Sequence, residues 1–252
     1  MDETEAVPAG SGGTALVTGA SGGIGSTLCR ELVSRDIRVL AVDVDWNGEA
    51  LDDLPHGSIH ATADVTKVEE ISDAIALLGD GRLDYAFLNA GLVSPNHPLL
   101  SLDEDDVRNV IDVNVVGTIF SLAETARKMV NQAAGSILLV ASVQALIGRP
   151  TYAVYGSSKA AVAALARHSA VELAPHGVRV NAIAPGGVMT PKQRSSFDDP
   201  TSGRSVDQEL SMVPMKRFAD TQEMASAMVD ICTRFSFATG STFVVDGGES
   251  VP

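Results

Sequence analysis

Short apolar runs alternate along the chain with longer stretches in which apolar residues recur every three or four positions. Nearly every position in the short runs is apolar, which is typical of strands covered on both faces. These predicted strands lie at residues 14–18, 38–42, 58–62, 85–89, 136–141, 178–184 and 241–245. The longer stretches predict amphipathic helices near residues 23–35, 67–78, 103–130, 152–175 and 221–233. Because strands and helices alternate, the pattern predicts an α/β fold, a doubly wound parallel sheet of seven strands with helices on both faces.

No shift in composition and no internal repeat divides this pattern, so residues 13–252 are predicted to form a single domain. Residues 1–12 are acidic and then rich in glycine and serine, which predicts a flexible N-terminal tail rather than a secretory signal. The stretch 191–214 is polar and punctuated by glycine and proline. It predicts a loop-rich insert late in the domain that acts as a mobile lid over a ligand.

Composition narrows the possible partners. The chain has 252 residues and a formal net charge of −14, which opposes binding to phosphate backbones and argues against a nucleic-acid partner. No apolar stretch approaches the roughly 18 residues of a membrane span, so no membrane partner is expected. Only two cysteines occur, Cys29 and Cys232, and they lie far apart in sequence. This usage fits a cytoplasmic protein without a disulfide framework.

The stretch "TGASGGIG", residues 18–25, joins the first predicted strand to the first predicted helix. It matches two phosphate-binding patterns, T-G-x-x-x-G-x-G through Gly19, Gly23 and Gly25, and T-G-x-x-G-x-x-G through Gly19, Gly22 and Gly25. Glycines let a ligand approach the backbone closely, and a helix that begins here presents free N–H groups and a positive dipole end to a diphosphate. The local sequence therefore predicts a dinucleotide site but does not choose between the patterns.

The second predicted strand ends at Asp43, about 20 residues after the glycines, where dinucleotide-binding folds place an acid that binds ribose hydroxyls. A helix cap or a loop charge is the alternative role for this residue. A carboxylate at this place would also repel a 2′-phosphate, and no lysine or arginine lies in the glycine loop to attract one. Together these features predict NAD as cofactor in preference to NADP.

Tyr155 and Lys159 are four residues apart in a predicted helix, so their side chains share one helix face. A nearby ammonium would lower the tyrosine pKa from about 10 and make the phenol usable as an acid and base. The Y-x-x-x-K pattern alone is common by chance. Here, however, Ser142 follows a buried strand, where a doubly wound sheet presents residues to its ligand. Asn114 lies in an otherwise apolar helix and needs partners, either as a structural hydrogen-bonding residue or as part of a relay.

Taken together, these motifs resemble those of the short-chain dehydrogenase/reductase (SDR) family in its compact single-domain branch, with a Rossmann-type fold. The similarity covers residues 14–248 and includes "NAG" at 89–91, "ADVT" at 63–66, "NAIAPGGVMT" at 181–190 and "DGG" at 246–248. It implies the catalytic residues Asn114, Ser142, Tyr155 and Lys159. It also implies a set of cofactor-binding residues: Gly19, Ser21, Gly23, Ile24, Asp43, Asp64, Val65, Asn89, Ala90, Gly91, Tyr155, Lys159, Pro185, Gly186, Val188 and Thr190.

The resemblance also resolves the glycine loop in favour of Gly19, Gly23 and Gly25, since the chain length and the other motifs belong to the compact branch. Gly22 then takes a position where NADP-preferring relatives often carry lysine or arginine. The chain departs from the family pattern at Leu88, where Asn is more usual, and at Gly156, where Ala or Ser is commoner. Glycine costs the helix a little propensity at that point.

The resemblance implies that a nicotinamide exchanges hydride with a secondary alcohol or its ketone while Tyr155 exchanges the proton. Lys159 would lower the Tyr155 pKa and bind the nicotinamide ribose, and Ser142 would hold the substrate oxygen. Asn114 would position a water that links Lys159 to solvent. The two long helices would carry the contacts of a homotetramer or homodimer.

The substrate is the least specified part of the prediction. The predicted substrate contacts are Gln144, Tyr152, His97 and Met189. The apolar residues near the site favour a mainly hydrophobic secondary alcohol: Leu92, Val93, Leu146, Ile147 and Met189. Alternatives are reduction of a 3-oxoacyl thioester, oxidation of a sugar or cyclic diol, and a catalytically silent nucleotide sensor. The longer epimerase/dehydratase branch is disfavoured because too few residues follow the Tyr155 helix. No histidine pair has metal-ligand spacing, so no metal site is predicted.

Overall fold

A computed structural model of the protein describes residues 12–46, 58–93, 98–199 and 205–251. Its sheet has seven strands in the order β3-β2-β1-β4-β5-β6-β7, and every neighbouring pair is parallel. The strands are β1 (Thr14–Thr18), β2 (Arg38–Asp43), β3 (Ile59–Thr62), β4 (Tyr85–Leu88), β5 (Gly135–Val140), β6 (Val178–Pro185) and β7 (Thr242–Val245). Each predicted strand lies within one residue of an observed one. The order reverses between β1 and β4, which confirms the doubly wound, Rossmann-type sheet and opens a ligand crevice at that point.

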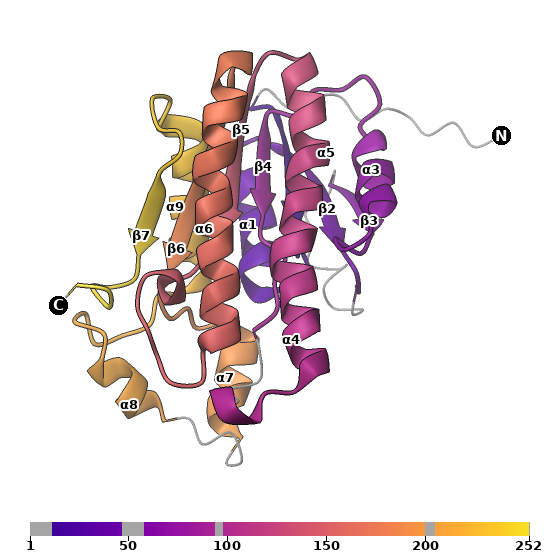
Figure 1. The fold of residues 1–252 in the computed structure, drawn as a ribbon. Helices are drawn as coiled ribbons and strands as arrows, with labels where there is room; N and C mark the ends of the chain where they lie inside the picture. Colours follow the sequence, from indigo (N-terminus) through magenta and orange to yellow (C-terminus); the bar gives the residue numbers. More distant parts are fainter. Residues whose placement is uncertain (1–11, 47–57, 94–97, 200–204, 252) are drawn as a thin grey trace.

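Helices cover both faces of this sheet (Figure 1). The principal helices are α1 (Gly23–Ser34), α3 (Val68–Ala76), α4 (Glu104–Ile111), α5 (Thr118–Asn131), α6 (Ala153–Leu173) and α9 (Thr221–Arg234). In β1, Ala15 and Val17 pack with α1 and α9, whereas Leu16 between them packs with α3, α5 and α6. Both side-chain directions of the strand are therefore buried, and this explains why its apolar run is continuous.

The predicted helix at 103–130 is interrupted, so a single continuous α-helix was the wrong expectation. A π-helical turn, η2 (Asp112–Gly117), separates α4 from α5. Asn114 lies in this turn and is completely buried. An alanine Cβ at Gly117 would lie 2.6 Å from Cγ2 of Val65, so the turn packs tightly against the segment after β3. A π-helical turn adds a residue to the helix and often marks a functional position.

The predicted loop-rich insert also contains helices. Its described parts include α7 (Pro191–Asp198) and α8 (Val206–Ser211), which lie beyond the carboxyl ends of the strands (Figure 1). Thr190 caps α7, since its Oγ1 accepts a hydrogen bond of 3.1 Å from the backbone N–H of Gln193, and Pro191 occupies the first helical position. Both are ordinary helix-start signals that the polarity of the segment obscured.

Candidate active site

The glycines of the loop between β1 and α1 differ in how much space is available for a side chain. Gly19 has a φ of +66°, a conformation that side chains disfavour. An alanine Cβ would lie 2.0 Å from the Gly19 carbonyl oxygen if placed at Gly25, and 2.9 Å from Cδ of Pro191 if placed at Gly23. At Gly22 its nearest neighbour would be 3.4 Å away, which is ordinary contact. Sterically, the required glycines are those of the T-G-x-x-x-G-x-G pattern, and Gly22 is the extra one.

This difference predicts unequal costs for two alanine substitutions. Gly25→Ala is expected to lower the free energy of unfolding by roughly 2 kcal/mol, because the Cβ forces the loop apart. Gly22→Ala, the matched control, is expected to stay within about 0.5 kcal/mol of the wild type. Urea unfolding followed by circular dichroism measures both values. Equal destabilisation by the two variants would contradict this account of the loop.

The glycine loop is fastened to the end of β4 by the predicted cofactor residue Asn89. The Nδ2 of Asn89 donates to the carbonyl oxygens of Thr18 at 3.1 Å and Gly19 at 3.0 Å. The backbone N–H of Ala90 donates to the Thr18 hydroxyl at 3.2 Å. The asparagine amide is thus committed to the loop's own backbone, so Asn89 fixes the shape of the loop.

Two other predicted cofactor residues, Ser21 and Asp43, contact each other directly. The Oδ2 of Asp43 accepts hydrogen bonds from the Ser21 backbone N–H at 2.8 Å and from its hydroxyl at 2.7 Å. The Oδ1 accepts from the backbone N–H of Val44 at 2.7 Å. The carboxylate that ends β2 therefore lies against the glycine loop, as the spacing predicted.

Asp64 and Val65 follow β3. The Oδ1 of Asp64 accepts from the backbone N–H and hydroxyl of Thr66, at 2.9 and 2.8 Å, so this carboxylate closes a local turn. Val65 is buried.

Ser142 and Tyr155 are brought together as expected. Ser142 follows β5 and caps a short 3₁₀ turn, η3 (Val143–Ala145), with its Oγ accepting from the backbone N–H of Gln144 at 3.2 Å. Tyr155 lies in the first turn of α6 and hydrogen-bonds to the Ser142 side chain. The Tyr152 ring packs edge-on to the Tyr155 ring, with 6.2 Å between centroids. Two hydroxyls therefore converge where a substrate oxygen would be held.

Lys159 lies one turn further along α6 and is buried. Its Nζ lies 5.9 Å from the centroid of the Tyr155 ring and donates a hydrogen bond of 2.8 Å to the Val140 carbonyl oxygen. An alanine Cβ at Gly91 would lie only 3.0 Å from this nitrogen, so the glycine of "NAG" makes room for the ammonium. Burial lowers the pKa of Lys159 to about 8.

Asn114 ties three segments together beside this lysine. Its Nδ2 donates to the Leu92 carbonyl oxygen at 2.9 Å and to the Ser158 hydroxyl at 3.0 Å, and its Oδ1 accepts from the Leu92 N–H at 2.7 Å. The same Oδ1 would lie 3.2 Å from a Cβ at Gly91. Both amide hydrogens are used, so the side chain retains only acceptor capacity. The structural role of Asn114 is clear, whereas its role in a water relay stays a prediction.

The segment that follows β6 carries the remaining predicted cofactor residues. The backbone N–H of Gly186 donates to Val245 at 3.0 Å, and that of Met189 donates to Ala219 at 2.8 Å. At the end of the segment, Cβ of Thr190 lies 3.0 Å from the position of a Cβ at Gly23. The segment after β6 therefore extends from the sheet to the glycine loop. The residues predicted to bind the nicotinamide end and those predicted to bind the diphosphate form one continuous surface, which we call the cofactor cradle.

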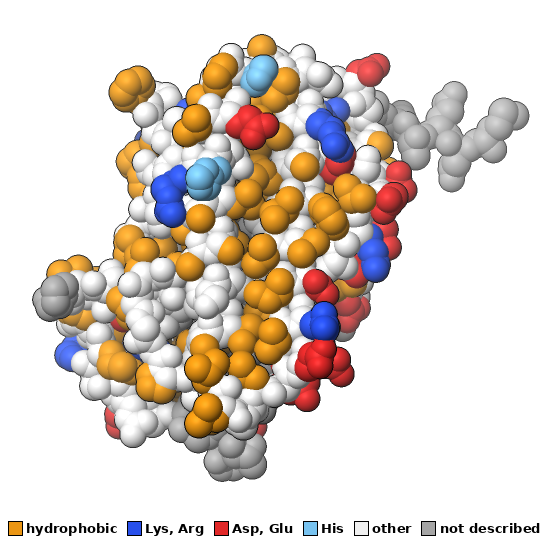
Figure 2. Space-filling view, in the orientation of Figure 1, with side chains coloured by type: hydrophobic (Ala, Val, Ile, Leu, Met, Phe, Trp, Pro, Cys, Tyr) orange, Lys and Arg blue, Asp and Glu red, His pale blue; other side chains and the backbone are white. Residues whose placement is uncertain are grey.

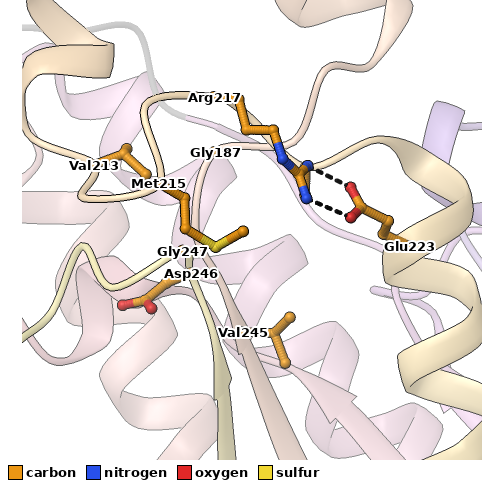
Figure 3. A pocket seen from close by; sticks show the side chains of 9 residues that line it. Gly187, Val213, Met215, Arg217, Glu223, Val245, Asp246 and Gly247 are labelled. Atoms are coloured by element: carbon orange, nitrogen blue, oxygen red, sulfur yellow. Dashed lines mark hydrogen bonds and ion pairs between the residues drawn. The ribbon is translucent and has the colours of Figure 1, made fainter.

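A pocket of about 110 Å³ lies beside this segment (Figure 3). It is lined by Gly187, residues 245–247 and the connection into α9, and Arg217 forms two hydrogen bonds of 2.7 Å with Glu223 at its edge. None of Ser142, Tyr155 and Lys159 lines it. This space lies away from the converging hydroxyls, and we do not assign the reaction to it.

Comparison with known proteins agrees with this geometry. The family described as enoyl-(acyl carrier protein) reductase matches residues 19–250. Glucose 1-dehydrogenase of Gluconobacter oxydans (strain 621H) is 34% identical over 248 residues, covering 92% of this chain and 90% of that protein. A 2,5-dichloro-2,5-cyclohexadiene-1,4-diol dehydrogenase of Sphingobium indicum is 33% identical over 245 residues, covering 94% and 97%. The structure of an NAD⁺-bound xylitol dehydrogenase superimposes with a TM-score of 0.86 at 30% identity, covering 94% of this chain and 98% of that one. The chain belongs to the short-chain dehydrogenase/reductase family.

Membership of the SDR family makes a nicotinamide dinucleotide the expected cofactor, and the cradle fits one. Glycines that admit no Cβ line the turn between β1 and α1, and Ile24 lies in the first turn of α1, where backbone N–H groups are free to bind phosphate. No described helix is long and apolar enough to cross a membrane. The candidate substrate residue His97 lies outside the described residues.

One expectation about this SDR site is wrong in the structure. Lys159 was expected to lower the pKa of Tyr155, but that pKa is raised, because burial outweighs the hydrogen bond with Ser142 and Tyr152 raises it further. The reason is geometric, since Nζ is held by the Val140 carbonyl oxygen and lies over the ring rather than at the hydroxyl.

Sequence reasoning also missed why Gly156 stands in α6 of this SDR. An alanine Cβ there would lie 2.8 Å from the Gln144 carbonyl oxygen, so the glycine lets the segment after β5 pack against the helix. The side-chain Oε1 of Gln144 is buried without a hydrogen-bond partner. Neither feature has a local sequence signal, apart from the departure of Gly156 from the family pattern.

Proposed function

We propose that this protein is an NAD(H)-dependent oxidoreductase that interconverts a secondary alcohol and its ketone. The observation that supports this most directly is the cluster formed by Ser142, Tyr155 and Lys159 beside the glycine loop. This cluster lies at the carboxyl ends of the strands, where doubly wound folds bind their ligands. It combines the Tyr155 hydroxyl, which could exchange a proton, with the Ser142 hydroxyl and the buried amine of Lys159.

The cofactor would be held by residues of three segments. The glycine loop and Ile24 would bind the diphosphate, and Asp43 and Ser21 would bind the adenosine ribose. Residues 185–190 would hold the nicotinamide end, which accepts or supplies the hydride in this chemistry.

In our proposal Tyr155 removes the hydroxyl proton during oxidation and returns it during reduction. Ser142 donates a hydrogen bond to the substrate oxygen and stabilises the charge that develops there. Lys159 binds the nicotinamide ribose and helps to hold a proton path through the Asn114 region. Burial favours the neutral phenol of Tyr155, which is the form that donates the proton during reduction, whereas oxidation uses the phenolate. Lys159 is an amine whose pKa burial lowers to about 8.

For the substrate we propose a mainly hydrophobic secondary alcohol, bound near the partly exposed side chains of Leu92, Val93 and Leu146. One observation favours a sugar or cyclic diol as the second candidate. The unpartnered amide oxygen of Gln144 costs free energy, and a hydrogen bond from a substrate hydroxyl would remove that cost. The names of the relatives, which include a sugar dehydrogenase and a diol dehydrogenase, support the same alternative.

A substrate panel tests this proposal. We expect the absorbance of reduced nicotinamide to appear when the protein and NAD⁺ meet a cyclic secondary alcohol or a cyclic diol, and not when they meet a primary alcohol of similar size. Ser142→Ala removes the proposed hydrogen bond to the substrate oxygen and should therefore reduce turnover by about 100-fold. Binding of NADH without turnover of any alcohol or ketone would favour the nucleotide sensor instead.

We also propose that the protein acts in the cytoplasm as a homotetramer or homodimer, and that α7 and α8 form a lid. Hydrophobic side chains gather over α5 and α6 in Figure 2. Among the large apolar residues of these helices, Ile119 is 42% exposed and Val171 is 79% exposed. Such a patch supports association through these helices.

A further inference from the structure

An ion pair that the proposed reaction does not use lies close to the site. The Nη2 of Arg149 lies 2.5 Å from Oε1 of Glu249, and the two side chains are only 15% and 4% exposed. The partners are 100 residues apart in sequence. Burying a charge pair carries a desolvation cost that simple surface contacts avoid, so its position in the site needs a reason.

We call residues 146–152, between η3 and α6, the substrate wall, because they include Leu146 and Tyr152, which we place near the substrate. Arg149 belongs to this wall. Its carbonyl oxygen accepts a hydrogen bond of 3.4 Å from the backbone N–H of Tyr152. A hollow of about 290 Å³ is lined by Arg149 together with Gln144, Tyr152 and Gly156. Movement of the arginine would therefore move the residues next to Ser142 and Tyr155.

Glu249 belongs to the turn after β7, and this turn is firmly built. The Oδ1 of Asp246 accepts from the backbone N–H of Gly248 at 2.9 Å, and its Oδ2 accepts from that of Ser250 at 2.7 Å. The Glu249 carboxylate also accepts a hydrogen bond from the backbone N–H of Gly187. Gly187 follows β6 in the segment that we assign to the nicotinamide, and it lines the pocket of Figure 3 together with Asp246.

The charges around Glu249 come from three other places in the chain. Burial raises the pKa of its carboxyl, Arg149 lowers it, and the nearby carboxylates of Asp246 and Glu209 raise it further. Glu209 lies in α8, the second helix of the proposed lid. The net effect is a raised pKa, so this carboxylate gains its proton at a higher pH than an ordinary glutamate.

We propose that Glu249 is a positioning residue that holds the substrate wall against the nicotinamide segment through its contacts with Arg149 and Gly187. This rests on the proposed function for the meaning of the two segments. Ionised Glu249 keeps the wall closed on the substrate, and protonated Glu249 releases Arg149. The residue does not touch the reacting atoms, so its effect falls on substrate binding rather than on the chemical step.

The test compares wild type with Glu249→Gln, which retains an acceptor for Gly187 and removes the charge. We expect KM for the alcohol to rise by about tenfold while kcat changes by less than about threefold, the pattern of lost binding rather than lost transition-state stabilisation. In the wild type, KM should also rise as the pH falls through the raised pKa of Glu249, and in the variant KM should be independent of pH over that range. Arg149→Met should raise KM as much as Glu249→Gln does. Arg149→Lys keeps the positive charge, so its KM should lie between that of Arg149→Met and that of the wild type.

One control variant and one further measurement show whether the effect is specific to the ion pair between Arg149 and Glu249. Arg108→Met removes an exposed ion pair with Glu104 and should leave KM and its pH profile unchanged. Hydrogen exchange of the full chain needs no turnover, and Glu249→Gln should raise exchange in residues 146–152 and 185–190 together. Unchanged exchange in those segments, or an unchanged pH profile of KM, would overturn the positioning role. Absence of any turnover by the wild type would overturn the proposed function alone, and the exchange measurement would still decide the role of Glu249.

Discussion

Replacing Tyr155 with phenylalanine is expected to lower kcat/KM for alcohol oxidation by at least about 1,000-fold, the size typical of losing a positioned general base. The phenol is the group that hydrogen-bonds with Ser142 beside the cofactor loop. The ring itself remains in the variant, so its packing against Tyr152 and the fold of α6 should persist. NADH affinity, measured by fluorescence titration, should stay within about threefold of the wild type because binding of the dinucleotide does not need the proton.

Tyr152→Phe provides the matched control. Both tyrosines lie at the start of α6 and their rings touch, but Tyr152 has Gly156 four residues later where Tyr155 has Lys159. We therefore expect kcat to change by less than about tenfold in Tyr152→Phe. Near-normal turnover by Tyr155→Phe, or an equal loss in both variants, would rule out the acid/base assignment.

The raised pKa of Tyr155 fixes the direction of the pH dependence. Burial favours the neutral phenol and raises its pKa, so only a small fraction is deprotonated near neutral pH, and this fraction grows as the pH rises. Wild-type oxidation should therefore increase with pH through neutrality, while ketone reduction, which needs the protonated phenol, should not. This dependence should disappear in the residual activity of Tyr155→Phe. A flat pH profile in the wild type would mean that another group carries the proton.

Strands β1, β2 and β5 could be located from the sequence because their burial is nearly uniform. Leu16, Leu40 and Leu139 face one set of helices while their neighbours face the other, so the middle of each of these three strands is an unbroken apolar run. Strand ends were equally clear, since Asp43, Asn89 and Ser142 mark where the chain leaves the sheet. These polar residues are also candidate site residues, because a doubly wound sheet presents its ligands at the carboxyl ends of its strands.

Features that depend on contacts distant in sequence could not be predicted in the same way. The π-helical turn around Asn114 depends on Leu92 and Ser158, and the need for Gly156 depends on the carbonyl oxygen of Gln144. The spacing of Tyr155 and Lys159 correctly placed both side chains on one helix face. It carried no information about the Val140 carbonyl oxygen that binds the lysine, and so the expected effect on the tyrosine pKa was wrong.

The glycine loop yields the second large prediction, a reversal of cofactor preference. In the wild type we expect kcat/KM with NAD to exceed that with NADP by at least about tenfold. The Asp43 carboxylate is fixed beside the loop by two hydrogen bonds from Ser21, so a 2′-phosphate would meet a negative charge that cannot easily move. The double variant Gly22→Arg/Asp43→Ser should shift the NAD to NADP ratio by at least about 100-fold towards NADP, since one repulsion is removed and one charge-assisted hydrogen bond of about 1.5–3 kcal/mol is added.

Steric room makes Gly22 the suitable position for the new arginine. It is exposed, its backbone has a φ of −69°, and a Cβ there meets nothing closer than 3.4 Å. The same arginine at Gly23 would have to displace Pro191 and Thr190, and it serves as the mismatched control that should lose activity with both cofactors.

The two single variants separate the contribution of the Asp43 charge to cofactor preference from that of the new arginine. Asp43→Ser removes the repulsion but also the partner of the Ser21 hydroxyl, so its activity with NAD should fall more than its activity with NADP rises. Gly22→Arg leaves Asp43 in place, and the new guanidinium should pair with that carboxylate, which limits its gain with NADP until Asp43 is removed. The combined change should therefore exceed the sum of the two single changes, expressed as free energies from kcat/KM. Additive single effects would show that residue 22 and Asp43 do not face the same phosphate, and an NADP preference in the wild type would show that Asp43 does not select the cofactor.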